Sequence, residues 1–399
     1  MYLYLIPPLY ILAYLLFFLI LNWWLGHAFA GYREMKKWRR ILFFIVYLFS
    51  ASPVLGCFLP DSSAKFFLTA VGNIWLGYFL YVGLIAIPLS IIAGAAGLMR
   101  GERTRRSRIT ARLCLIIALA GALGVNLYGS IHARDVQVHE IEVTLDKKLR
   151  TEGGKDTLRA ALIADLHMSV NSRPETIQRM VDLLNEQEPD LVFAAGDFLT
   201  STYYGLKDPE RYAEILRGIR SRYGSYAVYG NHDVEEPLLG GFPMTPISEA
   251  FRSEEIVSFI DSCGFRVISD EVEEIVGGTV VLVGREDGEK SGNGTEKRLE
   301  AEELMDGIDL TKPVLVLEHE PMDFENLSEA GADLVLSGHT HAGQIFPGNL
   351  ITPFFNANNY GLKTLYNLQS VVTSGVGFYG PPLRVGTDSE IMMVTIHFA

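Results

Sequence analysis

Four uncharged apolar runs fill most of the first third of the chain, and they restrict its possible folds more than any other feature. They cover residues 3–24, 41–59, 66–99 and 113–131. A helix needs roughly 20 apolar residues to cross about 30 Å of hydrocarbon. The first run is too long, and too weakly basic at its start, for a cleaved signal peptide. We therefore expect residues 1–134 to form an all-α transmembrane region of four helices.

Basic residues between these runs indicate the orientation of the region. Basic clusters lie at 33–40 and 100–108, whereas the loop at 60–65 contains only Lys65. Loops rich in Lys and Arg stay in the cytoplasm. Both clusters are therefore predicted to be cytoplasmic, and everything after residue 131 is predicted to lie outside. The sequence thus predicts a multi-pass protein of the cell membrane with an extracytoplasmic soluble part.

The remainder of the chain is polar and acidic. Residues 1–134 hold 13 Lys or Arg against 3 Asp or Glu, whereas residues 135–399 hold 21 against 44. Proteins that bind nucleic acids through backbone phosphates need a basic face, so we expect no nucleic-acid partner. The chain has only three cysteines and no CxxC spacing. A disulfide framework or a structural zinc site is therefore not expected.

The soluble part alternates between strand-like and helix-like segments. Strand-like runs lie at 158–164, 191–195, 226–229, 314–317 and 333–336, and helix-like stretches at 174–188, 209–222, 247–263 and 322–330. After residue 370 only strands are expected, at 370–374 and 390–397. This alternation predicts a largely parallel α/β sheet with helices outside, which becomes mixed near the C-terminus. We expect a linker at 135–154, with a short strand within 135–150, and a domain at 155–399.

Five short polar motifs in this domain each follow a strand-like run. They are Asp165-Leu166-His167, Gly196-Asp197, Gly230-Asn231-His232-Asp233, Glu318-His319-Glu320-Pro321 and Gly338-His339-Thr340-His341. Loops beyond the carboxyl ends of parallel strands form the sites of such folds. Carboxylate oxygens and neutral imidazole nitrogens bind divalent metals, and a hydrolytic pair of ions roughly 3.5–4 Å apart needs a bridging ligand. The motifs therefore predict a site for two divalent cations, with Asp197 as the natural bridge.

The motifs resemble those of the calcineurin-like metallophosphoesterases. The stretch at 338–347, Gly-His-Thr-His-Ala-Gly-Gln-Ile-Phe-Pro, is similar to a membrane-associated bacterial subgroup of that family, and so is the region at 377–384. The resemblance covers roughly residues 155–399. It implies an αββα sandwich of two mixed sheets, in agreement with the alternation above. It also implies hydrolysis of phosphate esters.

The resemblance further implies a role for each site residue. The first ion would take Asp165, His167, Asp197 and His341, and the second would take Asp197, Asn231, His319 and His339. Mixed imidazole and carboxylate ligation suits Mn, Fe, Zn or Co, so the metals stay open. A water or hydroxide bridging the ions would attack phosphorus in line. His232, which is not a ligand, would donate a hydrogen bond or proton toward the leaving oxygen or the phosphate.

Two positions depart from the family pattern. Family members often carry an acid three residues after the bridging aspartate, where it can orient the histidine, but this chain has Thr200 there. Thr200 cannot supply that charge to His232. Ala342 replaces a common glycine and constrains the turn. Two further roles stay open: Asp233 suits a turn as well as it suits help to His232, and Arg384 suits a phosphate contact or a solvated or paired position.

Apolar side chains on two loops leave the substrate class open. They lie at 236–248 and at 345–360, the latter with Phe354, Phe355 and Tyr360. They fit a lip that holds an acyl or prenyl chain, or ordinary loop packing.

Three functions are compatible with the sequence. The first is a membrane-anchored phosphoesterase that acts on an extracytoplasmic lipid-like or envelope phosphate ester, with membrane lipids around its anchor. The second is a nucleotide-sugar-lipid pyrophosphatase that faces the cytoplasm, which requires the opposite orientation. The third is a non-catalytic membrane scaffold, whose mark would be lost metal ligands. No ligand of the expected set is lost here.

Overall fold

The structure is a computed structural model that describes residues 36–98, 105–149, 156–239, 242–244, 247–292 and 297–399, together with Leu12 and Leu16. The chain divides into a helical unit and an α/β unit. We describe each unit by itself.

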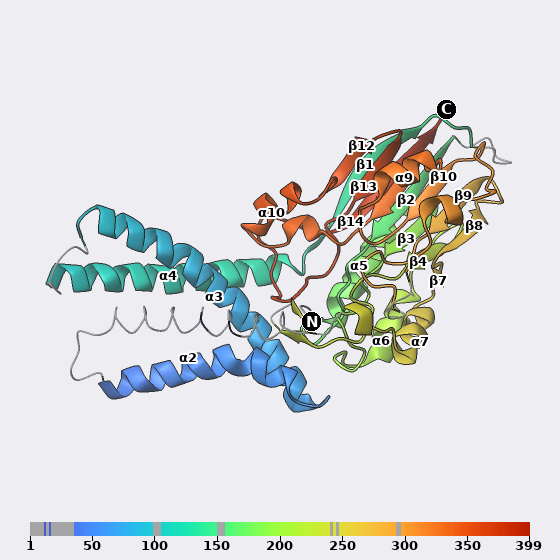
Figure 1. Cartoon of the computed structure of the whole chain (residues 1–399). Coiled ribbons are helices and arrows are strands. Elements are labelled where there is room, and N and C mark those ends of the chain that lie inside the picture. Colours follow the sequence, from blue (N-terminus) through green and yellow to red (C-terminus); the bar gives the residue numbers. More distant parts are fainter. Residues whose placement is uncertain are drawn as a thin grey trace. The chain divides into compact units, whose positions relative to one another are not determined.

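Between residues 36 and 132, the described part of the helical unit contains three helices (Figure 1): α2 (Lys36–Cys57), α3 (Ser63–Ala95) and α4 (Arg105–His132). The segments Leu238–Met244 and Gly380–Leu383 also belong to it, and the first of these forms the hairpin of β5 (Leu238–Leu239) and β6 (Phe242–Pro243). Trp75 of α3 donates a hydrogen bond to Ser50 of α2 at 3.0 Å. The buried positions of α3 include five small residues: Gly72, Gly77, Gly83, Ala86 and Ala93. Small residues let neighbouring helices approach closely, as in membrane bundles.

The expectation of four spanning helices is corrected by the structure. Among the described residues, only α3 and α4 are long and apolar enough to cross a membrane. The apolar part of α2 is limited to Phe44–Cys57, which spans roughly 21 Å at 1.5 Å per residue and falls short of about 30 Å of hydrocarbon. The reason is that basic residues take up the start of α2. The expected span at 3–24 lies outside the described residues, apart from Leu12 and Leu16.

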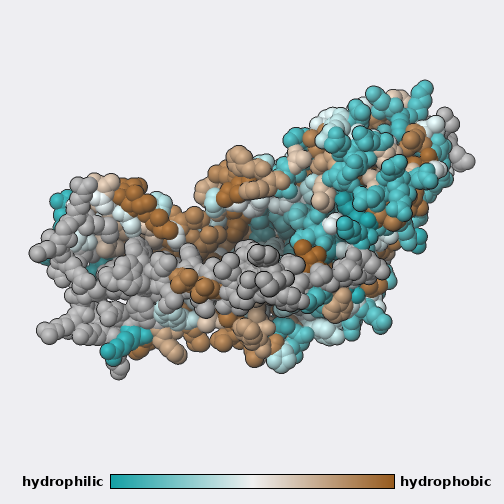
Figure 2. Space-filling view, in the orientation of Figure 1, coloured by the Kyte–Doolittle hydropathy of each residue, from teal (hydrophilic) through white to brown (hydrophobic). Residues whose placement is uncertain are grey.

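Side chains on the outside of these helices are mostly apolar. Phe44, Ile91 and Ile131 are 65–70% exposed, and the coloured surface of the helical unit is largely brown in Figure 2. Apolar side chains that gather on an exposed surface mark contact with a membrane or a protein.

The α/β unit is built on two six-stranded mixed sheets. In order across the first sheet lie β1 (Val136–Leu145), β14 (Ser389–Phe398), β2 (Thr157–Ile163), β3 (Leu191–Ala195), β4 (Ser225–Val228) and β7 (Arg266–Val267). In order across the second lie β12 (Gly361–Leu365), β13 (Leu368–Val372), β11 (Leu334–Ser337), β10 (Val314–Leu317), β9 (Val280–Gly284) and β8 (Glu271–Ile275). Most neighbours are parallel; β14 with β2, β12 with β13, and β8 with β9 are antiparallel.

The first half of the expected linker is part of a sheet. Strand β1 pairs in parallel with β14 over ten residues, from Val136 opposite Ser389 to Leu145 opposite Phe398. Val136, Val143 and Leu145 are buried. A strand this long begins only a few residues after α4 ends at His132. The α/β unit therefore starts about 20 residues earlier than the sequence suggested.

Three apolar cores separate four layers. One joins the first sheet to α5 (Pro174–Glu186), α6 (Pro209–Leu216) and α7 (Glu254–Ser262). A second lies between the two sheets. The third joins the second sheet to α8 (Ala301–Leu304) and α9 (Phe324–Glu329). The layers follow the expected order of helices, sheet, sheet and helices (Figure 1). Strands β10 and β11 are buried along their whole length, as parallel strands covered on both faces must be.

Local sequence explains the outer helices. In α5, Pro174 occupies the first turn, and the buried residues Ile177, Met180, Val181 and Leu184 recur at the spacing of one helical face. In α7, the Ser253 side chain caps the helix by accepting a hydrogen bond from the Ile256 amide. These helices fix the positions of the strands whose ends carry the polar motifs.

Candidate metal centre

Two carboxylates lie buried just beyond the ends of neighbouring parallel strands. Asp165 follows β2 and Asp197 follows β3, and their exposed fractions are 0% and 1%. The Asp165 carboxylate accepts a hydrogen bond from the His339 amide at 3.0 Å. Asp197 Oδ1 accepts one from the His232 amide at 2.8 Å. Loops from both sheets therefore meet at these two side chains.

The first cluster of donor atoms is formed by Asp165, His167 and His341. One atom from each lies within 4.8 Å of the others. The Nε2 atoms of His167 and His341 are 3.0 Å apart, and His341 Nε2 is 3.4 Å from Asp165 Oδ1. The predicted first set is thus assembled, and Asp197 Oδ2 joins it at 3.4 Å from His167 Nε2.

The second cluster surrounds His319. Its Nε2 lies 3.2 Å from the same Asp197 Oδ2 atom and 3.0 Å from Asn231 Oδ1. The ring of His339 stands edge-on to that of His319, with centroids 5.2 Å apart. The structure therefore brings all seven predicted ligands into one place, with a single oxygen of Asp197 between the two clusters.

The donor set fits cations. His319 Nδ1 lies 2.7 Å from the Ala195 carbonyl, so Nδ1 carries the proton and donates it. Nε2 then faces oxygens of Asp197 and Asn231, which are acceptors. His167 Nδ1 similarly contacts the Thr200 hydroxyl at 3.1 Å. Outer hydrogen bonds of this kind orient imidazoles toward a metal, and lone pairs that face one another need a proton or a metal ion between them.

Burial sets the protonation of the site. It raises the pKa of Asp165 to about 7 and lowers the pKa values of His167 and His339 to about 3. Burial would also lower the pKa of His319, but the charge of Asp197 outweighs it and raises that pKa well above its usual value. His167, His339 and His341, whose pKa values are all lowered by burial, are thus neutral near pH 7, as metal ligands must be.

Five of the seven predicted ligands have left-handed backbones. Their φ values are 54° at Asp165, 42° at His167, 56° at Asp197, 72° at His339 and 50° at His341. Residues other than glycine rarely adopt this region, and it concentrates at functional sites. Ala342 shares it at φ 49°, so the alanine in the glycine position does constrain the turn.

Gly230 shows why a glycine precedes Asn231. A Cβ atom there would lie 2.3 Å from Asp197 Oδ1 and 2.5 Å from the Asp197 amide nitrogen. Only glycine lets the two loops approach this closely.

Comparison with known proteins assigns this site to a family, because residues 158–343 match the model of the calcineurin-like phosphoesterases. Residues 158–343, a little under half of the chain, thus carry a calcineurin-like phosphoesterase domain. The chain is therefore a metal-dependent phosphoesterase.

Individual relatives share much of the chain. A transmembrane protein with metallophosphoesterase domain from Danio rerio is 26% identical over 90% of this chain and 80% of its own length. An uncharacterized metallophosphoesterase from Helicobacter pylori is 29% identical over 70% of this chain and 68% of its own length. Among solved structures, a putative 5′-nucleotidase from Staphylococcus aureus has 11% identity and a TM-score of 0.35. That match covers 59% of this chain and 54%, about half, of the nucleotidase.

His232 lies beside the phosphoesterase clusters, and its ring is held on two sides. Its centroid is 5.7 Å from that of His167. The Tyr379 ring stacks on it, with centroids 4.4 Å apart and planes 25° apart. Its Nδ1 contacts Glu236 Oε1 at 3.2 Å and Ser201 Oγ at 3.3 Å. Thr200, which stands where the family often has an acid, contacts His167 instead.

The sequence did not identify Glu236 and Tyr379 as neighbours of His232, or Lys290 as the partner of Glu236. Glu236 has one usable signal, since it is four residues after His232. Tyr379 and Lys290 approach from the loops that follow β13 and β9, so local spacing gives no indication of them.

Two open roles are decided by the structure. Asp233 accepts hydrogen bonds from the backbone amides of Asp197, Leu199 and Gly230, each at 2.9 Å, so it stabilises the turns. Arg384 is fully buried and donates to the carbonyls of Ser374, Gly375, Gly377 and Asp388. It is committed to holding its own loop, although one nitrogen lies 3.4 Å from His341 Nδ1.

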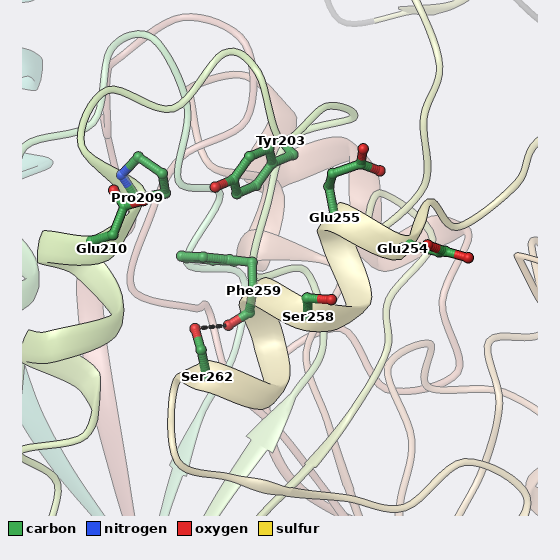
Figure 3. Close-up of a pocket in the computed structure, with 8 residues that line it drawn as sticks. All are labelled: Tyr203, Pro209, Glu210, Glu254, Glu255, Ser258, Phe259 and Ser262. Atoms are coloured by element: carbon green, nitrogen blue, oxygen red, sulfur yellow. Dashed lines mark hydrogen bonds between the residues drawn. The ribbon is translucent and has the colours of Figure 1, made fainter.

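A cleft of about 760 Å³ opens beside the second cluster. Its lining includes His339, Glu320, Met322, Phe355 and Tyr366. A separate cavity of about 360 Å³ lies between α6 and α7 (Figure 3), where Ser262 Oγ donates to the Phe259 carbonyl. None of the seven predicted ligands lines that second cavity. The cleft at His339 is therefore the better place for a substrate.

Metal binding is expected to release protons and to weaken as the pH falls. Without metal, Asp165 has a pKa of about 7 and His319 a pKa well above its usual value. A cation must displace both protons, so binding tightens as the pH rises and these groups lose them. Calorimetric titration of metal-stripped protein with Mn²⁺ at pH 6 and pH 8, in two buffers of different ionisation enthalpy, measures both effects. Equal affinity at both pH values, with no proton release, would contradict this expectation.

Proposed function

We propose that this chain is a membrane-anchored phosphoesterase that uses two divalent cations and hydrolyses a lipid-like phosphate ester outside the cytoplasm. One observation carries the two-cation part: Asp197 Oδ2 lies 3.4 Å from His167 Nε2 and 3.2 Å from His319 Nε2. A single carboxylate oxygen thus belongs to both donor clusters, as a bridging ligand requires.

Each residue then has a role. Asp165, His167 and His341 would hold one cation, Asn231, His319 and His339 the other, and Asp197 both. The two cations, drawn from Mn, Fe, Zn or Co, would supply an activated water and neutralise the phosphoryl oxygens. His232 would donate a proton from Nε2 to the leaving oxygen, because its Nδ1 already contacts Glu236.

Replacement of Asp197 by Asn tests the enzyme assignment. The amide keeps the size of the side chain but removes the charge that both clusters share. We expect metal-dependent hydrolysis of bis-p-nitrophenyl phosphate by the full chain in detergent to fall about 10²-fold or more, the scale for loss of an electrostatic group at a transition state. Asp182→Asn, an exposed position on α5, is the matched control. Equal rates for wild type and Asp197→Asn across several metals would refute the assignment.

Exposed apolar side chains near the cleft support a lipid-like substrate. Phe354 and Phe355 are 85% and 81% exposed, and Leu350 and Ile351 are 58% and 49% exposed. They lie on α10 (Gly348–Ile351) and the 3-10 helix η4 (Thr352–Phe354) with the residue after it, and Figure 2 shows a brown patch over α10. Both elements follow directly after the His339 and His341 motif, and Phe355 also lines the cleft. Such a surface suits contact with acyl chains.

The double change Leu350→Ser and Phe354→Ser separates lipid contact from catalysis. Neither residue lines the cleft. Burial of one large apolar side chain contributes roughly 1.5–3 kcal/mol. We therefore expect hydrolysis of a phospholipid in vesicles to fall about tenfold, while hydrolysis of bis-p-nitrophenyl phosphate stays within about twofold. Leu310→Ser, which changes a leucine that is 49% exposed elsewhere on the α/β unit, is the control. An unchanged rate on vesicles would show that the patch does not contact lipid.

The basic clusters at 33–40 and 100–108 support an extracytoplasmic active site. A reporter that is active only outside the cytoplasm, fused after residue 131, is expected to give a signal in whole cells. The same fusion with a reporter that is active only in the cytoplasm is expected to give no signal. The reverse pattern would favour an enzyme that faces the cytoplasm, such as a nucleotide-sugar-lipid pyrophosphatase.

A further inference from the structure

A buried carboxylate and a buried amine lie behind His232. The side chains of Glu236 and Lys290 are 0% and 1% exposed. Lys290 Nζ lies 2.8 Å from Glu236 Oε1 and 2.9 Å from Oε2, and Glu236 Oε1 is 3.2 Å from His232 Nδ1. The three side chains form a continuous chain of hydrogen bonds from Lys290 through Glu236 to His232.

The backbone fixes the same arrangement. The Ser201 amide donates to the His232 carbonyl at 2.9 Å, and the Glu236 amide donates to the Ser201 carbonyl at 3.0 Å. The Ser201 hydroxyl lies 3.3 Å from both His232 Nδ1 and Glu236 Oε1. The loop that carries Asp197 is therefore tied to both ends of the His232 to Glu236 turn.

The face of the imidazole is fixed independently of its edge. Tyr379 stacks on His232, and the backbone of Tyr379 is held by Gln344, which donates to its carbonyl at 2.9 Å and accepts from its amide at 2.7 Å. With one face packed and Nδ1 engaged, the nitrogen left for a substrate is Nε2.

We propose that Glu236 is the positioning residue of His232, and that Lys290 holds Glu236 in place as a carboxylate. This inference rests on the proposed function, in which His232 protonates the leaving group. When the bond between phosphorus and the leaving oxygen breaks, its electron pair stays on that oxygen, which takes the proton from Nε2. His232 is left neutral, with its Nδ1 proton still donated to Glu236. Glu236 thereby takes the place of the acid that Thr200 lacks.

Electrostatics around Glu236 agree with this role. Burial would raise the pKa of Glu236, but the hydrogen bond from His232 and the charge of Lys290 outweigh it, so that the net shift is downward. An ionised carboxylate accepts the Nδ1 proton and so fixes the orientation of the ring.

A purely structural alternative must be separated from positioning. Glu236 could serve only to neutralise the buried ammonium of Lys290, since loss of one partner of a buried ion pair is strongly destabilising. The two roles differ in one measurable way. Positioning of a general acid matters most when the leaving oxygen is basic, whereas general destabilisation affects all substrates alike.

The test uses the full chain in detergent with Mn²⁺ and two diesters, methyl p-nitrophenyl phosphate and methyl phenyl phosphate. We expect Glu236→Gln to lower kcat at least about tenfold for the phenyl ester, the more basic leaving group, and less than about threefold for the nitrophenyl ester. KM should change little for either. Glu235→Gln is the matched control, because this neighbouring carboxylate contacts the Tyr203 amide and Ser253 instead of His232. Its two rates should equal those of wild type.

Two double variants complete the test. Glu236→Gln with Lys290→Met removes both buried charges, so thermal stability should recover while the phenyl ester stays slow. Glu236→Gln added to His232→Ala should cause no further loss. Equal slowing of both esters by Glu236→Gln, or recovery of both rates in the variant with Lys290→Met, would overturn the positioning role. Rates that do not respond to Asp197→Asn would overturn the proposed function as well, which distinguishes the two failures.

Discussion

The buried carboxylate of Asp197 is the group on which the rest of the α/β unit depends. A carboxylate that is 1% exposed is costly to bury unless charges and hydrogen bonds compensate it. Here the compensation comes from the charge of His319 and the hydrogen bond from the His232 amide, which follow strands β10 and β4. Loops from both sheets must therefore converge on one side chain. The four-layer packing makes this possible because it holds the carboxyl ends of these parallel strands at a common edge.

Convergence of this kind requires backbones that would be unfavourable elsewhere. The left-handed conformations at Asp165, Asp197 and His341 turn each side chain sharply back toward the ends of the strands. Such residues cost of order 1–3 kcal/mol each and persist only where the surrounding structure fixes them. The fully buried β10 and β11 and the hydrogen bonds of Asp233 to three backbone amides provide that constraint. The rigid strands thus hold the loop residues in their strained conformations.

The sequence indicates which donor side chains lie near one another because each motif is local. Asp165 and His167, or His339 and His341, lie within three residues of one another at the end of an apolar run, so their proximity needs no tertiary information. The sequence predicts less where an element depends on distant partners. The sequence indicated a short strand in the linker but not that β1 belongs to the first sheet, because its pairing partner β14 is some 250 residues away. The run at 41–59 was counted as a span, but the apolar part of α2 is limited to Phe44–Cys57 and is too short to cross the hydrocarbon.

Position 200 carries a threonine where the family often has an acid. The case shows that the role of a residue depends on where its side chain lies in space more than on its place in a motif. A carboxylate at Nδ1 orients an imidazole that acts as a general acid. The carboxylate can come from any loop that reaches this nitrogen. Glu236 reaches that nitrogen from the turn that follows His232, while Thr200 is left to contact His167. The position of this carboxylate on Glu236 creates a need for a second charge. Glu236 is completely buried, so it needs a compensating charge, and Lys290 from the loop after β9 provides it. Loss of Lys290 would therefore leave a charged carboxylate unpaired, which makes the lysine part of the same arrangement although it never approaches His232.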